Sequence, residues 1–515
     1  MKEFRVLWVD DEIHHLKPHI LFLEQRGYNV SSSNSGAEAL KLVSEKNFDI
    51  VLLDENMPGI SGLETLSQIK IKQPSLPIVM ITKSEEENIM EEAIGGKISD
   101  YLIKPVNPSQ ILLSLKKNLD HSRLVSEKTT LGYQQEFRTI AMDMSYINTY
   151  EGWVELYEKL LYWELELENV EDTQMLEILN SQKSEANIQF GKFIEKNYSD
   201  LIEDSNGIEF SHTLFKNEVF PKINKDKPTL LLVVDNLRYD QWKVIEPVIE
   251  QHFTKQKEIA YSSILPTATQ YARNAMFSGL MPSEMEKQHP EWWKNDTDEG
   301  GKNLFEASFL EAQINRLNKD ISFQYHKITQ LKNGKKLAES LETQKTNDLT
   351  VIVYNFVDMI SHAKTEMEVI KELASTDKAY RSLTLSWFKN SPLYDIIQQA
   401  QNLGFQLMIT TDHGTINVKN PSKIIGDRES SQNLRYKTGK RLNYEARDVL
   451  AVTNPSDFHL PTINMTSSFV FAKESYYLTY PNNYNKFVNY FKNTYQHGGI
   501  SIEEMIIPFV VLSPK

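Results

Sequence analysis

The chain has 515 residues, of which 40% are hydrophobic and 24% charged, and its formal net charge is −14. This length exceeds what a single hydrophobic core usually covers, so we expect a globular protein of several domains. The acidic balance, with a sequence pI of about 5.5, disfavours direct binding to duplex DNA, because that needs a basic surface.

The lack of cysteine and of a long apolar stretch limits the kinds of metal site and the location that we expect. The sequence contains no cysteine, which excludes disulfides and thiolate metal sites, so a zinc site would need Asp and His ligands. It also lacks an apolar stretch of about 18 residues, and its N-terminus MKEFRVLWVDDE lacks the layout of a signal peptide. We therefore expect a cytoplasmic protein without membrane insertion.

Within residues 1–120, several apolar runs are typical of strands in a buried parallel sheet, and each leads directly into polar residues. The runs lie in FRVLWVDDE, IVLLDENMPG, LPIVMIT and SDYLIKPV. The polar side chains at or just after their ends are Asp10, Asp11, Asp54, Thr82, Tyr101 and Lys104. Carboxylates that converge at strand ends repel one another, so they favour a hard divalent cation such as Mg²⁺.

This pattern resembles the receiver domain of response regulators, which has a (βα)5 fold. The resemblance implies that Asp54 accepts a phosphoryl group from a sensor histidine kinase. It also implies that Asp10 and Asp11, together with Asp54, bind Mg²⁺, and that Lys104 pairs with the phosphoryl oxygens.

By the same resemblance, Thr82 and Tyr101 form the switch that responds to phosphorylation. One position departs from the usual pattern, since the residue after Thr82 is normally small and here is Lys83. Its bulk would slow access of water or of a partner to an acyl phosphate. The face near Tyr101 commonly becomes a dimer surface in receivers, so we expect a homodimer when the domain is phosphorylated. No helix-turn-helix pattern follows the receiver, which disfavours a DNA-binding output.

The middle of the chain, residues 121–205, contains little glycine and no proline. Apolar residues recur there every three or four positions, which is the spacing of one helix face. These residues are Trp153, Leu156, Leu160, Trp163 and Leu167. The pattern predicts a small helical bundle that connects the receiver to the next domain.

Residues 206–515 carry carboxylates, imidazoles and a hydroxyl, several of them directly after apolar runs such as TLLLVV, TVIVYNFV and FQLMITT. The candidates are Asp235, Thr269, Asp358, His362, Asp412, His413 and His497. Two adjacent borderline metals need about three oxygen or nitrogen ligands each. Such sites form at the carboxyl ends of strands in open α/β sheets. The set therefore predicts a two-metal site for phosphoryl transfer, with a hydroxyl nucleophile.

The order Asp, Thr, Asp-x-x-x-His, Asp-His-Gly and His-Gly-Gly resembles the alkaline phosphatase superfamily, and most closely its PglZ branch. The resemblance implies an α/β domain with a central sheet and two Zn²⁺ ions, each with three protein ligands. One group of ligands is Asp358, His362 and His497; the other is Asp235, Asp412 and His413, with Thr269 as the nucleophile that this second zinc activates.

Other residues near the nucleophile are candidates for the same site. Thr267 lies two positions before Thr269 and is the alternative nucleophile. Arg273 and Asn274 follow one helical turn later and are candidate contacts for phosphate oxygens, assisted by backbone amides at the helix N-terminus. Residues 280–345 depart from strand–helix alternation and read as a polar helical insertion, which in the superfamily covers the metal site.

One basic cluster stands out in the acidic chain, in the segment LRYKTGKRLNYEAR. Its members are Arg435, Lys437, Lys440 and Arg441. A solvated surface loop is the favoured interpretation, and contact with an anionic substrate is the alternative.

A receiver, a helical bundle and a PglZ domain in this order resemble the PorX-type response regulators of type IX protein secretion. The resemblance implies partners: the sensor kinase, a sigma factor and components of the secretion machinery. Two functions remain open. One is a zinc phosphodiesterase that acts on nucleotides or oligonucleotides and is controlled by Asp54. The other is a phosphorylation-switched protein-binding module with a structural zinc site. The hydroxyl of Thr269 favours the enzyme, since a structural site needs no nucleophile.

Overall fold

The computed structural model describes residues 4–74, 76–83, 98–170, 173–204, 207–426, 431, 433–462 and 466–515, apart from the side chains of 120–127, 362–363 and 368–369. Contacts divide the chain into two compact units. The smaller comprises residues 1–135 with 169–173, and the larger comprises 136–168 with 174–515. None of the helices in the described ranges is both long enough and apolar enough to cross a membrane.

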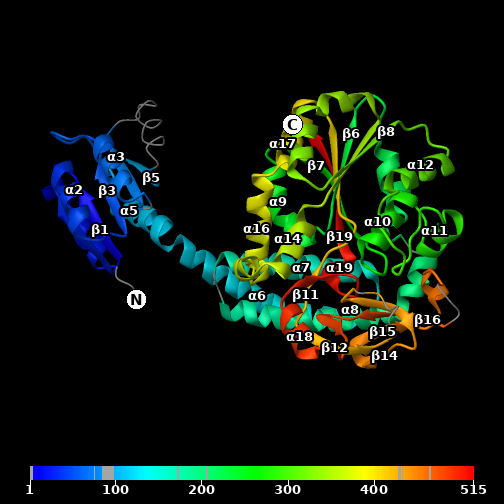
Figure 1. The fold of residues 1–515 in the computed structure, drawn as a ribbon. Coiled ribbons are helices and arrows are strands. Elements are labelled where there is room, and N and C mark those ends of the chain that lie inside the picture. The colour runs from blue at the N-terminus through cyan, green and yellow to red at the C-terminus, as the bar shows by residue number, and fades with distance from the viewer. Residues whose placement is uncertain are drawn as a thin grey trace. The chain divides into compact units, whose positions relative to one another are not determined.

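The smaller unit contains a parallel five-stranded sheet in the order β2-β1-β3-β4-β5 (Figure 1). Its strands are β1 (Phe4–Val9), β2 (Tyr28–Ser33), β3 (Ile50–Asp54), β4 (Ile78–Thr82) and β5 (Asp100–Ile103). Its described helices are α1 (Lys17–Glu24), α2 (Gly36–Glu45), α3 (Gly62–Lys72) and α5 (Pro108–Leu115). The predicted receiver fold is confirmed.

The inner strands follow directly from their sequences. Every residue of β3 and β4 is buried, as expected for strands covered on both faces by helices. The edge strand β2, with the sequence YNVSSS, is only partly buried and lacks the apolar run that marks the other strands. Because all five strands are parallel, Asp54 and Thr82 come to lie at the same edge of the sheet.

The larger unit is built on a mixed six-stranded sheet in the order β7-β19-β10-β6-β9-β8. Its strands are β6 (Thr229–Val234), β7 (Phe253–Ser262), β8 (Phe323–Ile328), β9 (Leu349–Tyr354), β10 (Gln406–Thr410) and β19 (Ile506–Pro514). The strands β10, β6, β9 and β8 are parallel. At the other edge β19 pairs antiparallel with β10, and β7 pairs antiparallel with β19. The apolar runs before Asp235, Asp358 and Asp412 are the central strands β6, β9 and β10, as predicted.

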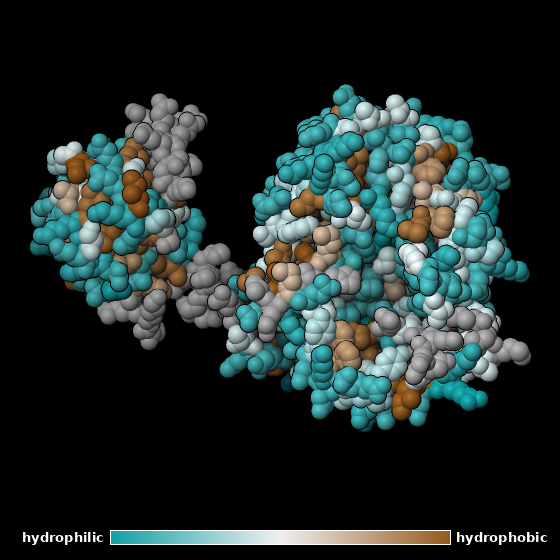
Figure 2. All heavy atoms as spheres, in the orientation of Figure 1, coloured by the Kyte–Doolittle hydropathy of each residue, from teal (hydrophilic) through white to brown (hydrophobic). Residues whose placement is uncertain are grey.

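Helices cover both faces of this sheet (Figure 1). On one side lie α9 (Tyr239–Ile249), α14 (Phe356–Glu366), α16 (Asp377–Lys389) and α17 (Pro392–Asn402), whose apolar residues share a core with the central strands. On the other side lie α10 (Thr269–Ser278), α11 (Pro282–Gln288) and α12 (Glu306–Arg316). The face drawn in Figure 2 is mainly hydrophilic, with hydrophobic residues in small separate patches.

Smaller elements complete the unit. The short helices α13 (Leu331–Glu339), α15 (Glu368–Leu373), α18 (Tyr484–Phe491) and α19 (Ile502–Met505) lie between or beside the strands in the sequence. A short two-stranded sheet pairs β11 (Ile416–Asn417) with β18 (Tyr495–Gln496). Two three-stranded sheets comprise β12 (Asn420–Ile425), β14 (Asn443–Tyr444) and β17 (Tyr476–Thr479), and β13 (Tyr436–Lys440), β15 (Val449–Val452) and β16 (Ser467–Ala472).

The helical middle of the chain forms α6 (His121–Tyr146), α7 (Tyr150–Asn169) and α8 (Thr173–Glu203). The predicted apolar face of α7 is buried except at Trp163, which is partly exposed. Trp153 packs against Phe190 of α8 with ring centroids 5.7 Å apart. Both helices also contact the sheet-bearing part of the unit. The Tyr239 hydroxyl of α9 donates to Glu158 of α7 at 2.7 Å, and Asn187 of α8 donates to Glu503 at 3.0 Å.

Residues 280–345 differ from the predicted helical insertion. They contain α11, α12 and α13, but also β8, the edge strand of the central sheet. The sequence FQYHKI of β8 is only partly buried, so it lacks the apolar run that identifies the inner strands. The segment is therefore in part a component of the sheet rather than an insertion outside it.

Candidate functional sites

The receiver residues converge at the carboxyl end of the small sheet. Ligand atoms of Asp10, Asp11 and Asp54 all lie within 4.8 Å of one another. Lys104 Nζ lies 2.8 Å from Asp10 Oδ2 and 3.0 Å from Asp54 Oδ1. Burial raises the pKa of Asp54 to about 6, and the nearby Lys104 ammonium opposes that rise. An acidic cluster with one internal cation can bind a divalent ion and hold a phosphoryl group.

The predicted switch residues lie beside this cluster. Thr82 is buried at the end of β4, and its hydroxyl donates a 2.6 Å hydrogen bond to Glu55, the residue after Asp54. Lys83 is exposed and lies 3.8 Å from the Glu12 carboxylate. The Thr82 hydroxyl is thus bonded to a carboxylate that neighbours the predicted phosphorylation site.

A second cluster lies in the larger unit, at the ends of the central strands. Asp235 follows β6, and Asp412 and His413 follow β10, so parallel pairing brings all three together. Their ligand atoms lie within 4.8 Å of one another, and all three residues are buried. Burial and the nearby carboxylates of Asp412 and Asp358 raise the pKa of Asp235 well above its usual range, against the effect of Arg273.

Two predicted imidazole ligands have a defined orientation. His413 Nδ1 donates to the Gly414 carbonyl at 3.1 Å, and His497 Nδ1 donates to the Thr267 carbonyl at 3.1 Å. Each Nε2 atom is therefore left as the nitrogen with a lone pair for a metal. The two rings are stacked with centroids 4.1 Å apart, and burial lowers the pKa of His413 to about 4, which keeps it neutral.

The two glycine-containing motifs owe their glycines to close backbone packing. A Cβ at Gly414, after Asp412 and His413, would lie 1.9 Å from the Glu503 carbonyl oxygen. Gly498, after His497, has φ +119°, a conformation that L side chains rarely adopt. The glycines in Asp-His-Gly and His-Gly-Gly thus allow the backbone next to each imidazole to pack closely or to adopt a conformation that other residues disfavour.

The two candidate nucleophiles have different environments. Thr269 begins α10, is only partly buried, and its Oγ1 lies 3.1 Å from His413 Nε2. Thr267 is fully buried, and its Oγ1 accepts from the Gly498 N–H and donates to the Gly499 carbonyl, both at 3.0 Å. The hydroxyl that faces the predicted ligands is that of Thr269.

The other predicted site residues have the following surroundings. Asp358 lies on α14 and affects the pKa of Asp235, while the side chain of His362 lies outside the described residues. Arg273 is fully buried and pairs with Asp235, with Asp412 at 3.0 Å and with Glu306 at 3.5 Å.

Asn274 is buried and bonded to the segment after α11. Its Nδ2 donates to the Lys302 carbonyl at 3.1 Å, and its Oδ1 accepts from Asn303 at 3.3 Å. The structure thus gives Asn274 and Arg273 protein partners, and their contact with phosphate oxygens stays a prediction.

Two members of the basic cluster are not in a solvated loop. Arg435 is fully buried and pairs with Glu504 at 2.6 Å, and Glu504 also accepts from the Gly499 N–H at 2.9 Å. Lys437 is buried and donates to the Ser431 carbonyl at 2.8 Å. The favoured interpretation of a surface loop is therefore wrong for these two residues. Arg435 instead supports the loop that follows His497.

The donor set fits a bound metal ion. Asp235 Oδ1 is buried against the Arg273 guanidinium. Each imidazole uses its Nδ1 for a backbone carbonyl, so Nε2 is the nitrogen that can ligate a metal, and His413 Nε2 lies 3.1 Å from the Thr269 hydroxyl. The positive charge of Arg273 offsets only part of the buried negative charge, because Glu306 shares it. Two carboxylates, an imidazole and an adjacent hydroxyl form a set that can bind a cation and activate an alcohol.

Comparison with family models matches three consecutive parts of the chain. Residues 6–116 match the response regulator receiver domain, and residues 123–202 match the PorX response regulator linker domain. Residues 214–512 match the BREX system PglZ alkaline phosphatase-like domain.

Curated relatives match a part of the chain about as long as the receiver domain. The transcriptional regulatory protein ZraR of Klebsiella oxytoca is 38% identical over 125 residues, which is 24% of this chain and 28% of that protein. ResD of Bacillus subtilis is 34% identical over 114 residues, or 22% of this chain and 47% of that protein. The chain thus spans under half of the length of either relative.

Solved structures also match this part. A CheY-like receiver domain protein from Methanospirillum hungatei is 28% identical, with a TM-score of 0.23, and covers 23% of this chain and 96% of that one. The PglZ match spans more than half of the chain and the linker match lies directly before it. The chain therefore belongs to the PglZ family of alkaline phosphatase-like proteins, in the receiver–linker–PglZ arrangement of PorX-type response regulators.

Proposed function

We propose that this response regulator has an enzymatic output, a zinc-dependent phosphodiesterase that acts on nucleotide or oligonucleotide substrates. The observation that carries the proposal is the position of Thr269, whose hydroxyl lies 3.1 Å from His413 Nε2 at the edge of a buried Asp/His cluster. A hydroxyl needs a base or a metal to become a nucleophile at neutral pH. A purely structural metal site would not require it.

The site residues have separate roles in this reaction, as metal ligands and as the nucleophile. Asp235, Asp412 and His413 would hold one Zn²⁺, and Asp358, His362 and His497 a second. When bound, these ions would lower the pKa of the Thr269 hydroxyl and stabilise the leaving oxygen. Thr269 Oγ1 loses its proton and forms a bond to phosphorus, while the bond to one ester oxygen breaks and that oxygen leaves as an alcohol after it takes up a proton. Water then hydrolyses the bond between phosphorus and Thr269, which releases the remaining phosphomonoester and restores the threonine hydroxyl.

The electrostatics favour a diester over a monoester. Arg273, one helical turn after Thr269, is fully buried and occupied by the carboxylates of Asp235, Asp412 and Glu306. It therefore offers little charge to the second negative oxygen of a monoester dianion. A phosphodiester carries a single negative charge and needs less compensation.

We also propose that phosphorylation of Asp54 by a histidine kinase, with Mg²⁺ at Asp10 and Asp11, controls the enzyme through dimerisation in the cytoplasm. The match of residues 123–202 to the PorX linker supports a role in type IX secretion. A sigma factor and secretion components are the protein partners that this role suggests.

A hydrolysis screen of the zinc-loaded protein tests the activity. We expect turnover of bis-p-nitrophenyl phosphate and of short linear or cyclic oligonucleotides, and at least tenfold slower turnover of p-nitrophenyl phosphate. Preference for the monoester would contradict the charge argument. Lack of turnover with every substrate, in protein that retains zinc, would favour the protein-binding module.

A further inference from the structure

Apart from Asp235, the predicted metal ligands lie on three segments of the chain, and Tyr495 contacts two of these segments and belongs to the third. In β18 it pairs with Asn417 of β11, which follows Asp412 and His413. Its carbonyl accepts a 3.2 Å hydrogen bond from Ser361 Oγ of α14, the helix that carries Asp358 and His362. Tyr495 itself lies two residues before His497.

The ring of Tyr495 also has several close contacts. It stacks on Tyr380 with centroids 4.0 Å apart and planes 17° from parallel. The ammonium of Lys364, also on α14, lies 4.0 Å from the ring centroid, and the Arg238 guanidinium lies 5.2 Å from it. Cations over an aromatic face attract it, most strongly when desolvated. Tyr495 therefore fixes α14 against β18 through its ring as well as its carbonyl.

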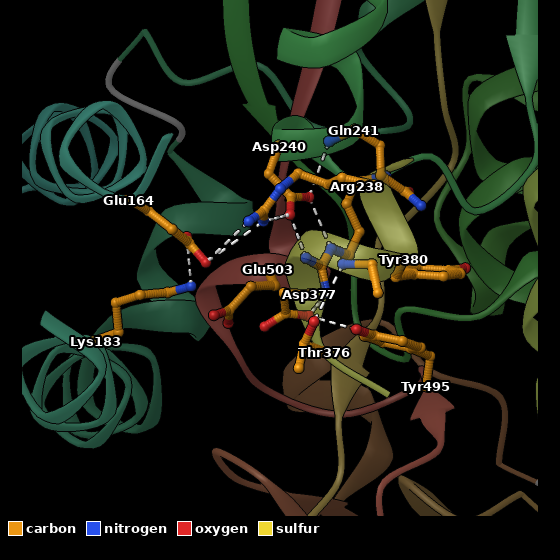
Figure 3. A network of polar contacts seen from close by, with 12 residues as sticks. Glu164, Lys183, Arg238, Asp240, Gln241, Thr376, Asp377, Tyr380, Tyr495 and Glu503 are labelled. Atoms are coloured by element: carbon orange, nitrogen blue, oxygen red, sulfur yellow. Dashed lines mark hydrogen bonds and ion pairs between the residues drawn. The ribbon is translucent and has the colours of Figure 1, made fainter. Parts of the chain in front are cut away.

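The hydroxyl of Tyr495 connects this point, through Asp377, to an ionic network (Figure 3). The Asp377 side chain is 31% exposed, whereas Arg238 is buried. The Tyr495 hydroxyl donates to Asp377 Oδ1 at 2.6 Å, and the same oxygen accepts from Arg238 Nη1 at 2.9 Å. Arg238 Nε in turn donates to Asp240 Oδ1 at 2.8 Å. The side chains of Arg238 and Asp240 are only 2% and 3% exposed, so their interaction is little screened by water.

The network continues from Asp240 into the linker helices. Arg381 Nη1 donates to Asp240 Oδ2 at 2.6 Å, while Arg381 Nη2 lies 3.4 Å from Glu164 of α7. Glu164 also accepts from Lys183 of α8 at 2.7 Å, as Figure 3 shows. A continuous series of charge-assisted contacts thus runs from α7 and α8 to the residue that holds the ligand segments together.

We propose that Tyr495 is a positioning residue for the metal ligands, and that its bond to Asp377 makes their geometry depend on the linker helices. The ligand assignment rests on the proposed function, but the contacts of Tyr495 do not. Glu164, Arg381, Asp240 and Arg238 are buried, so water cannot replace a lost ionic partner among them. A change at Glu164 therefore alters the positions of the charged side chains that follow it in the network. The linker helices therefore act on the site through Arg381, Asp240, Arg238 and Asp377.

Hydrogen–deuterium exchange of the full-length protein tests this inference. Tyr495→Phe keeps the ring and removes only the hydroxyl. We expect exchange to rise about tenfold in peptides covering 356–366, 411–417 and 494–500 together, the size expected for losing a hydrogen bond to a carboxylate. Zinc loss to a chelator should accelerate in parallel. Glu164→Gln, at the other end of the network, should raise exchange in the same peptides.

Tyr477→Phe is the matched control, because it removes a buried hydroxyl that donates to the Val488 carbonyl at 2.9 Å. Its effect should stay within residues 476–491. Wild-type exchange in all three peptides of Tyr495→Phe would overturn the inference, even in an active enzyme. Joint loosening of the three peptides in a protein that binds no zinc would uphold the coupling and reject the proposed function instead.

Discussion

Replacing Thr269 with valine is expected to abolish hydrolysis of phosphodiesters while leaving the fold and the metal content intact. Valine keeps the shape of the side chain but removes the oxygen that lies 3.1 Å from His413 Nε2. Loss of a covalent nucleophile typically costs at least about 10³-fold in kcat. Steady-state kinetics on bis-p-nitrophenyl phosphate, with zinc measured on the same preparation, checks the result.

Thr267→Val provides the comparison, since it removes a hydroxyl with a different environment. The Thr267 Oγ1 bonds both Gly498 and Gly499, so its loss leaves two buried backbone groups without partners, at a cost of about 1–3 kcal/mol each. We expect lower thermal stability and weaker zinc retention, but residual turnover per bound zinc. Near-normal turnover in Thr269→Val, together with none in zinc-loaded Thr267→Val, would transfer the nucleophile to Thr267.

Beryllofluoride is expected to convert the protein from a mostly monomeric to a dimeric form. A phosphoryl mimic on Asp54 adds charge beside Asp10 and attracts Lys104, which lies 3.0 Å from Asp54 in this structure. We expect the Thr82 hydroxyl then to exchange its bond to Glu55 for one to the new oxygens. Coupling energies of this kind correspond to a change of about tenfold or more in the dimerisation constant.

Sedimentation velocity with and without beryllofluoride and Mg²⁺ measures this shift. Asp54→Ala should remain monomeric under both conditions. Asp49→Ala should respond as the wild type does, because Asp49 lies before β3 and accepts from the Arg5 N–H rather than facing the acidic cluster. If beryllofluoride-treated wild type and Asp54→Ala sediment alike, the receiver does not control assembly.

The elements that position the sites were largely predictable because they are buried on all sides. The apolar runs TLLLVV and IVLLD form β6 and β3, and their composition alone identifies them as buried strands. A carboxylate, Asp235 after β6 and Asp54 at the end of β3, marks where each strand ends. The edge strands β2 and β8 are partly exposed and polar, so their sequences resemble loops or surface helices.

The contacts within the site could not be read from the sequence, because they join residues that are distant along the chain. Arg273 is close to Thr269 in sequence, yet it contacts Asp412, 139 positions away. Tyr495 is a tyrosine in a polar segment, and its contacts with Ser361 and Asp377 span 134 and 118 positions. The charge pattern at Arg435 indicated solvent exposure, because the Glu504 that neutralises it follows 69 positions later.

Zinc stoichiometry tests the central claim most directly. The claim is that the Asp/His cluster is a two-metal centre, so elemental analysis of protein purified with zinc should give about two zinc ions per chain. His413→Ala and His497→Ala should each reduce that number by about one, since they belong to different ligand groups. Well under one zinc per chain in the wild type, with zinc supplied, would contradict the account.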